Sequence, residues 1–434
     1  MAPAILPNIW RVFNLRASPF WQDPLGDGDQ AHPLSLFVGR EAELQTLTIG
    51  LYGAGASSSR RAIAGSLGIG KTTLVKQFKA VAQANDFLTT DSVVPIYADD
   101  TSDSLFGRVL GSVYDILLAN RPHIVDHPAM QAAQVLVRAA RERIRGGGGS
   151  MFGVGASVSQ SMVTTAPRDM LLDGPRVLRD LMTLVGESDA HGVLVHLNNL
   201  EHLSESDAER AGVILRDLRD PMLMHNGLHV VLVGTVEAIR ATVLTHAQVR
   251  TTFSVLTLEP LDLAEVQALL RERYAWMRLD KTAPFVTPVN DQAVATLYEL
   301  FEGDLRGVLK ALEDGVTPNI GLVPTQTSLP KSETHVFGPL AFDDLRPTLQ
   351  RAYLAELNTL VEPSRVAQLT GWGQQDASAI HTQKSLGILW GISQSAVSQA
   401  VTALTRAGYV RVIPRALGSP TQYVLTGRSR LIFT

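Results

Sequence analysis

The stretch GSLGIGKTT, from Gly65 to Thr73, limits what this chain can fold into more than any other. It follows the apolar run RRAIA, and Gly65, Gly70, Lys71 and Thr72 satisfy the spacing G-x-x-x-x-G-K-[ST]. In this motif backbone N–H groups converge on phosphate oxygens, the lysine reaches the β- and γ-phosphates, and the hydroxyl can ligate Mg²⁺. The motif therefore predicts a strand, a phosphate loop and a helix over residues 71–84, with ATP and Mg²⁺ as cofactors.

An ordinary glycine turn between a strand and a helix is the alternative interpretation of this stretch. Such a turn needs neither a lysine nor a hydroxyl at these positions, so the phosphate loop is favoured. The hydroxyl of Thr72 is the predicted metal ligand. The predicted nucleotide-binding residues of the loop are Gly65, Gly68, Gly70, Lys71, Thr72 and Thr73.

Alternating strands and helices surround the loop. The apolar runs SVVPIYADD, GVLVHLNNLEHL and LHVVLVGTVEAI are each followed by polar residues and helical patterns. Near-continuous apolar strands in such an order indicate a parallel sheet covered on both faces. After residue 257 the strands give way to helices, then to a stretch rich in proline and hydroxyl residues, and finally to a helical tail with two strand-like runs.

The 434 residues, 45% of them hydrophobic and 18% charged, exceed what one core usually serves. We expect an irregular arm (1–36) laid over a domain surface, an α/β nucleotide-binding domain (37–257), a helical domain (258–316), a linker (317–340) and a tail domain (341–434). The absence of cysteine excludes disulfides and thiolate metal sites. Without a long apolar run, the chain is expected to be soluble and cytoplasmic, with no membrane association.

Hydrolysis requires a carboxylate near the Mg²⁺ shell as well as a phosphate loop. The strand VLVHLNNLE, where acidic residues are expected, ends instead in Asn198 and Asn199, with Glu201 beyond. Either Glu201, Asp99 or Asp100 compensates, or the site binds ATP and turns it over slowly; we favour slow or absent turnover. The nearby His196 and His202 lack a third ligand and are interpreted as packing and surface residues.

Several segments together resemble AAA+ ATPases of the origin-recognition (Orc/Cdc) type. They are FVGREAEL, GSLGIGKTT, the strand ending LVGT, HAQVRTTF, LEPLDLAEVQALLRERY and FEGDLRGVLKAL. The resemblance covers residues 36–315, and a winged-helix-like tail extends it. It implies an α/β fold class with a P-loop AAA+ domain, a helical lid and a C-terminal winged helix.

The resemblance also assigns roles to residues outside the loop. Thr235 takes the sensor 1 position, Arg250 that of an arginine finger, and Arg306 that of the sensor 2 arginine. The residues expected to flank the adenine are Phe37, Val38, Gly39 and Arg40. The two arginines could instead be surface residues in solvated ion pairs, and Phe37 could be a core residue.

The tail has the order of a winged helix, with a second helix over residues 394–406 and a wing tipped by Gly418 and Pro420. From His381 to Thr434 it carries six basic residues and no Asp or Glu, which is the electrostatic footprint of duplex binding. The predicted DNA-binding residues are Ser395, Ser398, Gln399, Arg406, Arg411 and Arg415. A protein-binding winged helix is the alternative.

The sequence thus predicts an ATP-binding protein that binds double-stranded DNA and uses nucleotide state as an assembly switch, as a homo-oligomer or with a partner protein. Replication initiation, mobile-element regulation and defence share these parts. The alternatives are a signalling ATPase whose tail binds a protein, and a ligand-responsive transcription regulator. The glycine-rich segment 146–166 is either a hairpin facing a channel or DNA, or a surface insertion.

Overall fold

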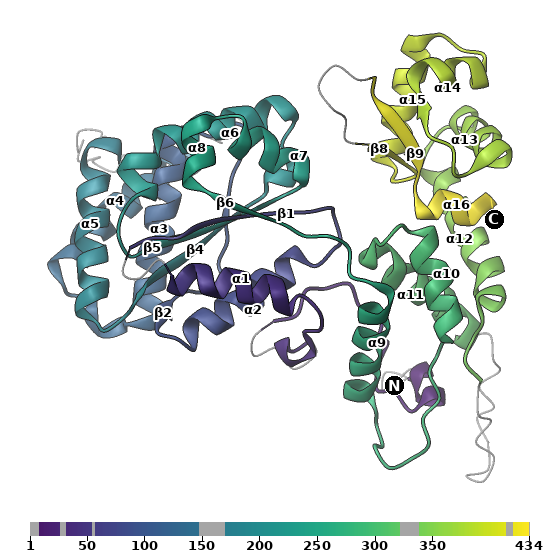
Figure 1. Cartoon of the computed structure of the whole chain (residues 1–434), viewed down its shortest axis with the longest axis horizontal. Coiled ribbons are helices and arrows are strands. Elements are labelled where there is room, and N and C mark those ends of the chain that lie inside the picture. Colours follow the sequence, from purple (N-terminus) through teal and green to yellow (C-terminus); the bar gives the residue numbers. More distant parts are fainter. Residues whose placement is uncertain are drawn as a thin grey trace, which may run out of the picture. The chain divides into compact units, whose positions relative to one another are not determined.

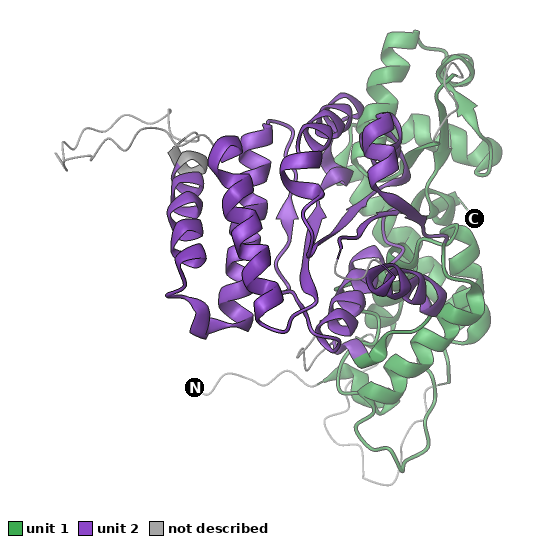
Figure 2. Cartoon of the chain, turned by 60° about the vertical axis from the view of Figure 1, so that its left-hand side comes forward, with its two compact units in different colours: residues 1–24, 35–39, 260–434 green, residues 25–34, 40–259 purple. Residues whose placement is uncertain are grey.

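The computed structural model describes residues 8–26, 32–53, 57–146, 170–321, 338–413 and 420–433, without the side chains of 143–146. They form two compact units, coloured separately in Figure 2. The α/β unit comprises Leu25–Leu34 and Arg40–Glu259, and the helical unit comprises Met1–Pro24, Ser35–Gly39 and Pro260–Thr434.

A parallel sheet forms the centre of the α/β unit, with strand order β2-β4-β5-β1-β6 and β3 paired to β4. Its strands are β1 (Arg60–Ala64), β2 (Phe87–Leu88), β3 (Val94–Pro95), β4 (Gly192–Asn198), β5 (Leu228–Gly234) and β6 (Ser254–Thr257). Every residue of β5 is buried, as expected for a central strand covered on both faces. The predicted parallel sheet is confirmed, and β5 lies between the loop strand β1 and β4.

Helices cover the two faces of this sheet. In Figure 1, α1 and α2 lie along one side and α6, α7 and α8 along the other. The helices are α1 (Glu41–Tyr52), α2 (Lys71–Gln83), α3 (Ser102–Asn120), α4 (Pro128–Gly146), α5 (Met170–Glu187), α6 (Glu205–Asp217), α7 (Val236–Ile239) and α8 (Ala247–Thr252). The helix predicted after the phosphate loop is thus confirmed.

One hydrophobic core runs through the helical unit. Its elements are the short 3-10 helix η1 (Ile9–Phe13), α9 (Leu263–Met277), α10 (Asp291–Leu300), α11 (Leu305–Gly321), α12 (Phe342–Leu360), α13 (Pro363–Asp376), β7 (His381–Thr382), α14 (Gln383–Trp390), α15 (Gln394–Arg406), β8 (Val410–Ile413), β9 (Gln422–Leu425) and α16 (Gly427–Phe433). Helix α11 continues past residue 316, where a linker was expected to begin.

The N-terminal arm is largely irregular, as expected, and its aromatic side chains pack into the helical unit. Trp10, Phe13, Leu15 and Phe20 are buried in the core that also contains side chains of α9 and α11. Arg273 of α9 donates to the carbonyl oxygens of Pro19 and Trp21 and stacks over the Trp21 ring. Single aromatic residues in an irregular segment show no periodicity, so the sequence did not reveal which side chains of the arm are buried.

Candidate functional site

The phosphate loop connects β1 to α2 through glycines in the left-handed region. Gly68 has φ +80° and Gly70, which precedes the first residue of α2, has φ +95°. Gly65 is required for a different reason, because a Cβ there would lie 2.3 Å from Cδ1 of Ile69. The spacing of the motif therefore follows from backbone geometry, which only glycine adopts readily at these positions.

Lys71 is buried at the start of α2 and its Nζ turns back into the loop. Nζ donates to the carbonyl oxygens of Gly65 at 2.9 Å and Ser66 at 2.8 Å. A phosphate oxygen is a stronger acceptor for an ammonium group than a neutral carbonyl. The lysine thus lies where it can exchange two backbone acceptors for a phosphate, and the half-buried Thr72 and Thr73 follow it in the first turn of α2.

The end of β4 supplies amides rather than carboxylates. Asn198 Oδ1 is buried with no hydrogen-bond partner among the described residues, whereas Asn199 donates to the Ile96 carbonyl oxygen at 3.2 Å. Asn199 has φ +81°, and this left-handed residue leads into a single 3-10 turn, Leu200–His202. That turn places Glu201 Oε2 3.9 Å from Lys71 Nζ.

Of the three carboxylates considered from the sequence, Glu201 pairs with the loop lysine, at 3.9 Å. Asp100 accepts from the Tyr97 N–H at 2.8 Å and from Ser104 Oγ at 2.9 Å, and it pairs with Arg108. Asp99 is exposed. The remaining carboxylate, Glu201, is three positions beyond Asn198 and forms an ion pair with the lysine that would bind phosphate.

The loop and the residues around it fit a magnesium-bound triphosphate. Lys71 supplies positive charge, Thr72 a hydroxyl for the metal, and the unpartnered Asn198 Oδ1 an acceptor for a metal-bound water. When bound, Mg²⁺ would neutralise phosphate charge. Among the residues that the structure describes, no group of three His, Cys, Asp or Glu side chains could hold a metal by itself.

Arg40 braces the loop, a role that the sequence did not reveal. It is buried, has φ +67°, and precedes the first residue of α1. One guanidinium nitrogen donates to the Ile69 carbonyl oxygen at 3.3 Å and to the Glu259 carbonyl oxygen, while the other pairs with Glu43. The arginine therefore ties the loop backbone to α1 within the α/β unit. Phe37, Val38 and Gly39 belong to the helical unit, and Phe37 and Val38 are half-buried there.

The other proposed nucleotide contacts are placed as follows. Thr235 is the N-cap of α7, and its hydroxyl accepts from the Ala238 N–H at 3.2 Å. Arg250 is exposed on α8, and Arg306 is exposed in the first turn of α11. Asp304 caps α11 through the Gly307 N–H at 3.1 Å, and burial raises its pKa.

Two histidines of the sheet are packing residues, as expected for His196 but not noticed for His229. Burial, with a smaller effect from the neighbouring Lys79 cation, lowers the pKa of His196 to about 3. Burial lowers the pKa of His229 to about 4, with a smaller effect from Arg60. Lys79 donates to the carbonyl oxygens of Thr90 and Ser92 and fixes that loop. His202 is exposed.

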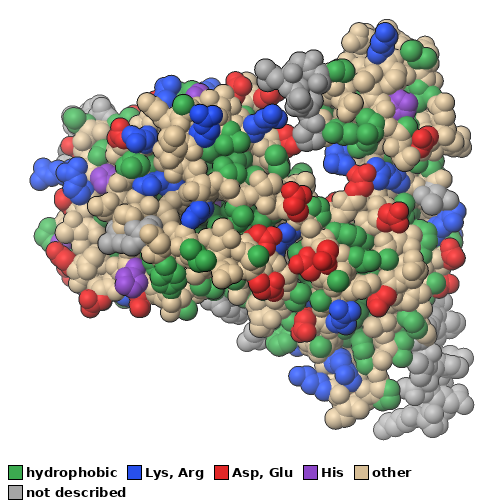
Figure 3. All heavy atoms as spheres, in the orientation of Figure 1, with side chains coloured by type: hydrophobic (Ala, Val, Ile, Leu, Met, Phe, Trp, Pro, Cys, Tyr) green, Lys and Arg blue, Asp and Glu red, His purple; other side chains and the backbone are tan. Residues whose placement is uncertain are grey.

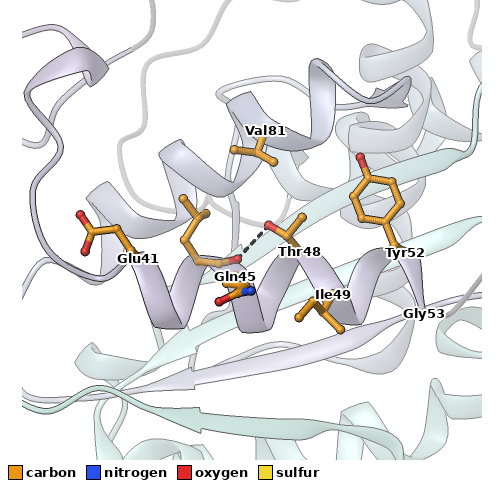
Figure 4. A pocket seen from close by; sticks show the side chains of 8 residues that line it. Glu41, Gln45, Thr48, Ile49, Tyr52, Gly53 and Val81 are labelled. Carbon is orange, nitrogen blue, oxygen red and sulfur yellow. Dashed lines mark hydrogen bonds between the residues drawn. The ribbon is translucent and has the colours of Figure 1, made fainter.

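A groove of about 600 Å³ lies along α1 (Figure 4), and no residue of the phosphate loop lines it. Thr48 points along it and donates to the Leu44 carbonyl oxygen at 2.8 Å. Apolar side chains dominate its lining, so it does not suit a phosphate. Its residues are Glu41, Leu44, Gln45, Thr48, Ile49, Tyr52, Gly53 and Val81.

The tail has the element order predicted for a winged helix. The second helix, α15, spans the predicted residues, and β7 and β8 flank β9 in a three-stranded antiparallel sheet. Val397, Ala400, Val401 and Leu404 are the buried face of α15. The candidate base-facing residues Ser395, Ser398 and Gln399 are exposed, as is Arg406. Arg415 and most of the segment 146–166 lie outside the described residues.

Three basic residues of the tail are paired with carboxylates of the same unit. Arg411 of β8 and Arg430 of α16 both contact Glu302, which lies between α10 and α11. Arg428 pairs with Glu356 of α12 at 3.0 Å. Figure 3 shows basic and acidic side chains side by side where the tail meets these helices. The positive charge counted along the sequence is therefore partly neutralised, while Lys384 and Arg406 are exposed.

No protein-family model matches the sequence. No curated protein matches it either. No helix in the described residues is long and apolar enough to span a membrane.

The chain is similar to several solved structures at low identity. They include ORC2 of Aeropyrum pernix in ADPNP–ADP complexes (16% identity, TM-score 0.48, 95% of each chain covered). The chain is also similar to the structure of ORC1 of the same organism in complex with DNA, at 13% identity and a TM-score of 0.41, with 98% of this chain and 96% of that chain covered. A third similar structure is that of Cdc6p of Pyrobaculum aerophilum, at 13% identity and a TM-score of 0.42, with 92% of this chain and 97% of that chain covered. These are proteins of the type that the sequence resembles, and because the TM-scores lie below 0.5, the α/β assignment rests on this chain's own strand order and loop.

Proposed function

We propose that this chain is an ATP-binding, duplex-DNA-binding AAA+ protein of the replication-initiator-like type, in which nucleotide state acts as an assembly switch. The observation that carries the proposal is the phosphate loop, with Lys71 Nζ held on two loop carbonyl oxygens. Mobile-element and defence ATPases share this chemistry. Equilibrium binding of a fluorescent ATP analogue with Mg²⁺ tests the nucleotide part, and absence of binding contradicts it.

The switch requires two bodies that respond to one nucleotide. The chain supplies an α/β unit with the loop and a helical unit that includes the tail. We propose Arg306, exposed on α11, as the arginine of the helical unit that senses nucleotide, and Arg250 as the residue offered to a neighbouring copy. Light scattering with and without ATP tests whether assembly depends on nucleotide. If the molar mass of the protein in solution is the same in both conditions, the plain transcription regulator is favoured.

Slow or absent hydrolysis is expected at this site. Asn198 and Asn199 carry no charge and cannot act as bases, and Glu201 forms an ion pair with Lys71. Phosphate release by the unmodified protein is expected to be no faster than release by a Lys71→Ala variant. A clearly faster rate that disappears in Glu201→Gln would instead identify Glu201 as the water-orienting carboxylate.

Duplex binding is proposed to use the exposed polar face of α15. We expect affinity for a duplex to fall steeply as salt rises, and Arg406→Ala to reduce the slope of log K against log salt by about 1, the value for one lost phosphate contact. Fluorescence anisotropy with a labelled duplex over a salt series measures both. Arg351→Ala, which removes an exposed arginine of α12, is the matched control and should leave the slope unchanged.

Substitutions are preferable to removal of the tail. A truncation near residue 348 would cut through α12, whose Leu345 and Leu349 are buried in the shared core. The truncated protein would lose core packing as well as the tail, so a loss of DNA binding would not identify the surface responsible.

A protein-binding tail is the second candidate, favoured by exposed apolar side chains. Ile380 and Ile388 are 58% and 78% exposed at the start of the winged helix and on α14. Exposed apolar groups of this kind mark partner surfaces when they are contiguous. A full-length protein with no salt-sensitive affinity for duplex DNA would favour this signalling candidate over the proposed function.

A further inference from the structure

The turn that joins α10 to α11 makes an unusual set of contacts with the tail. Its residue Glu302 has φ +51°, in the left-handed region of backbone conformation that residues other than glycine rarely adopt. The two carboxylate oxygens of Glu302 serve different arginines: Oε1 accepts from Arg430 and Oε2 accepts from Arg411. One acidic residue of the lid thus contacts both the wing and the last helix.

The two arginines differ in exposure. The side chain of Arg430 is 14% exposed and that of Arg411 is 51% exposed. Next to them Gly427 packs against Phe301, since a Cβ at Gly427 would lie 2.5 Å from the Phe301 ring. Arg430 and the Phe301 contact therefore hold the Glu302 carboxylate in place, and Arg411 is the partner that solvent, or another anion, can reach.

We propose that Glu302 is an autoinhibitory clasp, which competes with DNA phosphates for Arg411. The inference rests on the proposed binding of duplex DNA by the tail. A carboxylate and a phosphate use the same donors of a guanidinium group, so Arg411 cannot satisfy both fully. While the clasp is closed, the wing offers less positive charge to a duplex than its sequence suggests.

The energetics allow the clasp to open. An ion pair exposed on one side is weak and is screened by salt, so a phosphate can displace the carboxylate. The clasp therefore sets how tightly the tail holds DNA without preventing binding. Because the turn leads directly into α11, which carries Arg306, the clasp also lies in the segment that we propose to respond to nucleotide.

Glu302→Gln tests the clasp in the full-length protein. The amide keeps the size of the side chain and removes its charge. We expect about fivefold tighter binding of a mixed-sequence duplex at low salt, because the DNA phosphate no longer competes with the Glu302 carboxylate for Arg411. Glu299→Gln, which removes an exposed carboxylate from α10, is the control and should leave the affinity unchanged.

Arg411→Gln completes the test as a double-variant cycle. If the gain in Glu302→Gln comes from Arg411, it disappears in the double variant, and this result supports the clasp. A gain that persists in the double variant, or no gain although the unmodified protein binds DNA, overturns the clasp and leaves the proposed function standing. If neither the unmodified protein nor Glu302→Gln binds duplex DNA, the proposed DNA function fails and the clasp fails with it.

Discussion

Lys71→Ala is expected to lower the affinity for ATP about 100-fold. The substitution removes a buried ammonium group that can form charge-assisted hydrogen bonds to the phosphates, a loss of about 3 kcal/mol of binding free energy. Arg40, the other cation that contacts the loop in the described residues, does not replace this charge, because it is committed to carbonyl oxygens and Glu43. Titration of a fluorescent ATP analogue in the presence of Mg²⁺ measures the change.

Lys76→Ala is the matched control, since Lys76 lies on the same helix but outside the loop. It should leave the affinity for ATP unchanged. Lys71 also fixes the loop through Gly65 and Ser66, so thermal unfolding without nucleotide must be compared. If Lys71→Ala binds ATP as tightly as the unmodified protein while both unfold at the same temperature, the loop is not the nucleotide site.

The α/β unit is expected to be less stable at pH 5 than at pH 7.5, because two of its buried histidines resist protonation. His229 Nδ1 accepts from the Ser59 N–H at 3.1 Å, so a proton on Nδ1 would face another donor. Its pKa is about 4 in the folded protein against 6.5 for the ordinary side chain. His196 behaves likewise, with a pKa of about 3 next to Lys79. Both histidines are therefore neutral in the folded protein at pH 5.

The direction in which pH changes the free energy of unfolding follows from how many protons the folded and the unfolded chain bind. Below pH 6.5 the unfolded chain takes up protons that the folded chain does not, so the free energy of unfolding falls as the pH falls. From pH 7.5 to pH 5 each histidine is expected to cost about 2 kcal/mol, and the pair about 4 kcal/mol. Urea unfolding followed by circular dichroism at the two pH values measures the loss.

The variants His229→Gln and His196→Leu remove the titrating groups. The amide oxygen introduced by His229→Gln can still accept from the Ser59 N–H, and the combined variant should show a much smaller difference between pH 7.5 and pH 5. His202→Gln, at an exposed position, should keep the full difference. An equal loss of stability in the combined variant and in the unmodified protein would show that other groups cause the acid sensitivity.

Local signals predicted the elements closest to the chemistry. The helices after the phosphate loop and over residues 394–406 appear where they were expected, within one residue at their ends. In the first, the motif itself fixes where the helix begins. In the second, Ser393 caps the helix and the apolar period is regular. Both signals act within a few residues and so can be read from sequence.

Contacts between distant residues could not be predicted in this way. The contact of Arg40 with the loop spans 29 residues and depends on a left-handed backbone. The carboxylate that neutralises Arg411 and Arg430 lies 109 and 128 residues earlier in the chain. The charge of the tail, counted along the sequence, therefore included six basic residues but not the two carboxylates, Glu302 and Glu356, that form ion pairs with three of them. The choice of Glu201 over Asp100 likewise depended on tertiary ion pairs.

The buried arm has a consequence for how the protein is made. Arg273 of the helix that packs on Trp10 and Phe20 donates to the Pro19 and Trp21 carbonyl oxygens, which lie 254 and 252 residues earlier in the chain. At ordinary translation rates the aromatic side chains wait roughly 10 to 50 s for their partners. During biosynthesis the core of the helical unit therefore cannot close until α9 has been made, and the aromatic side chains of the arm stay uncovered until then.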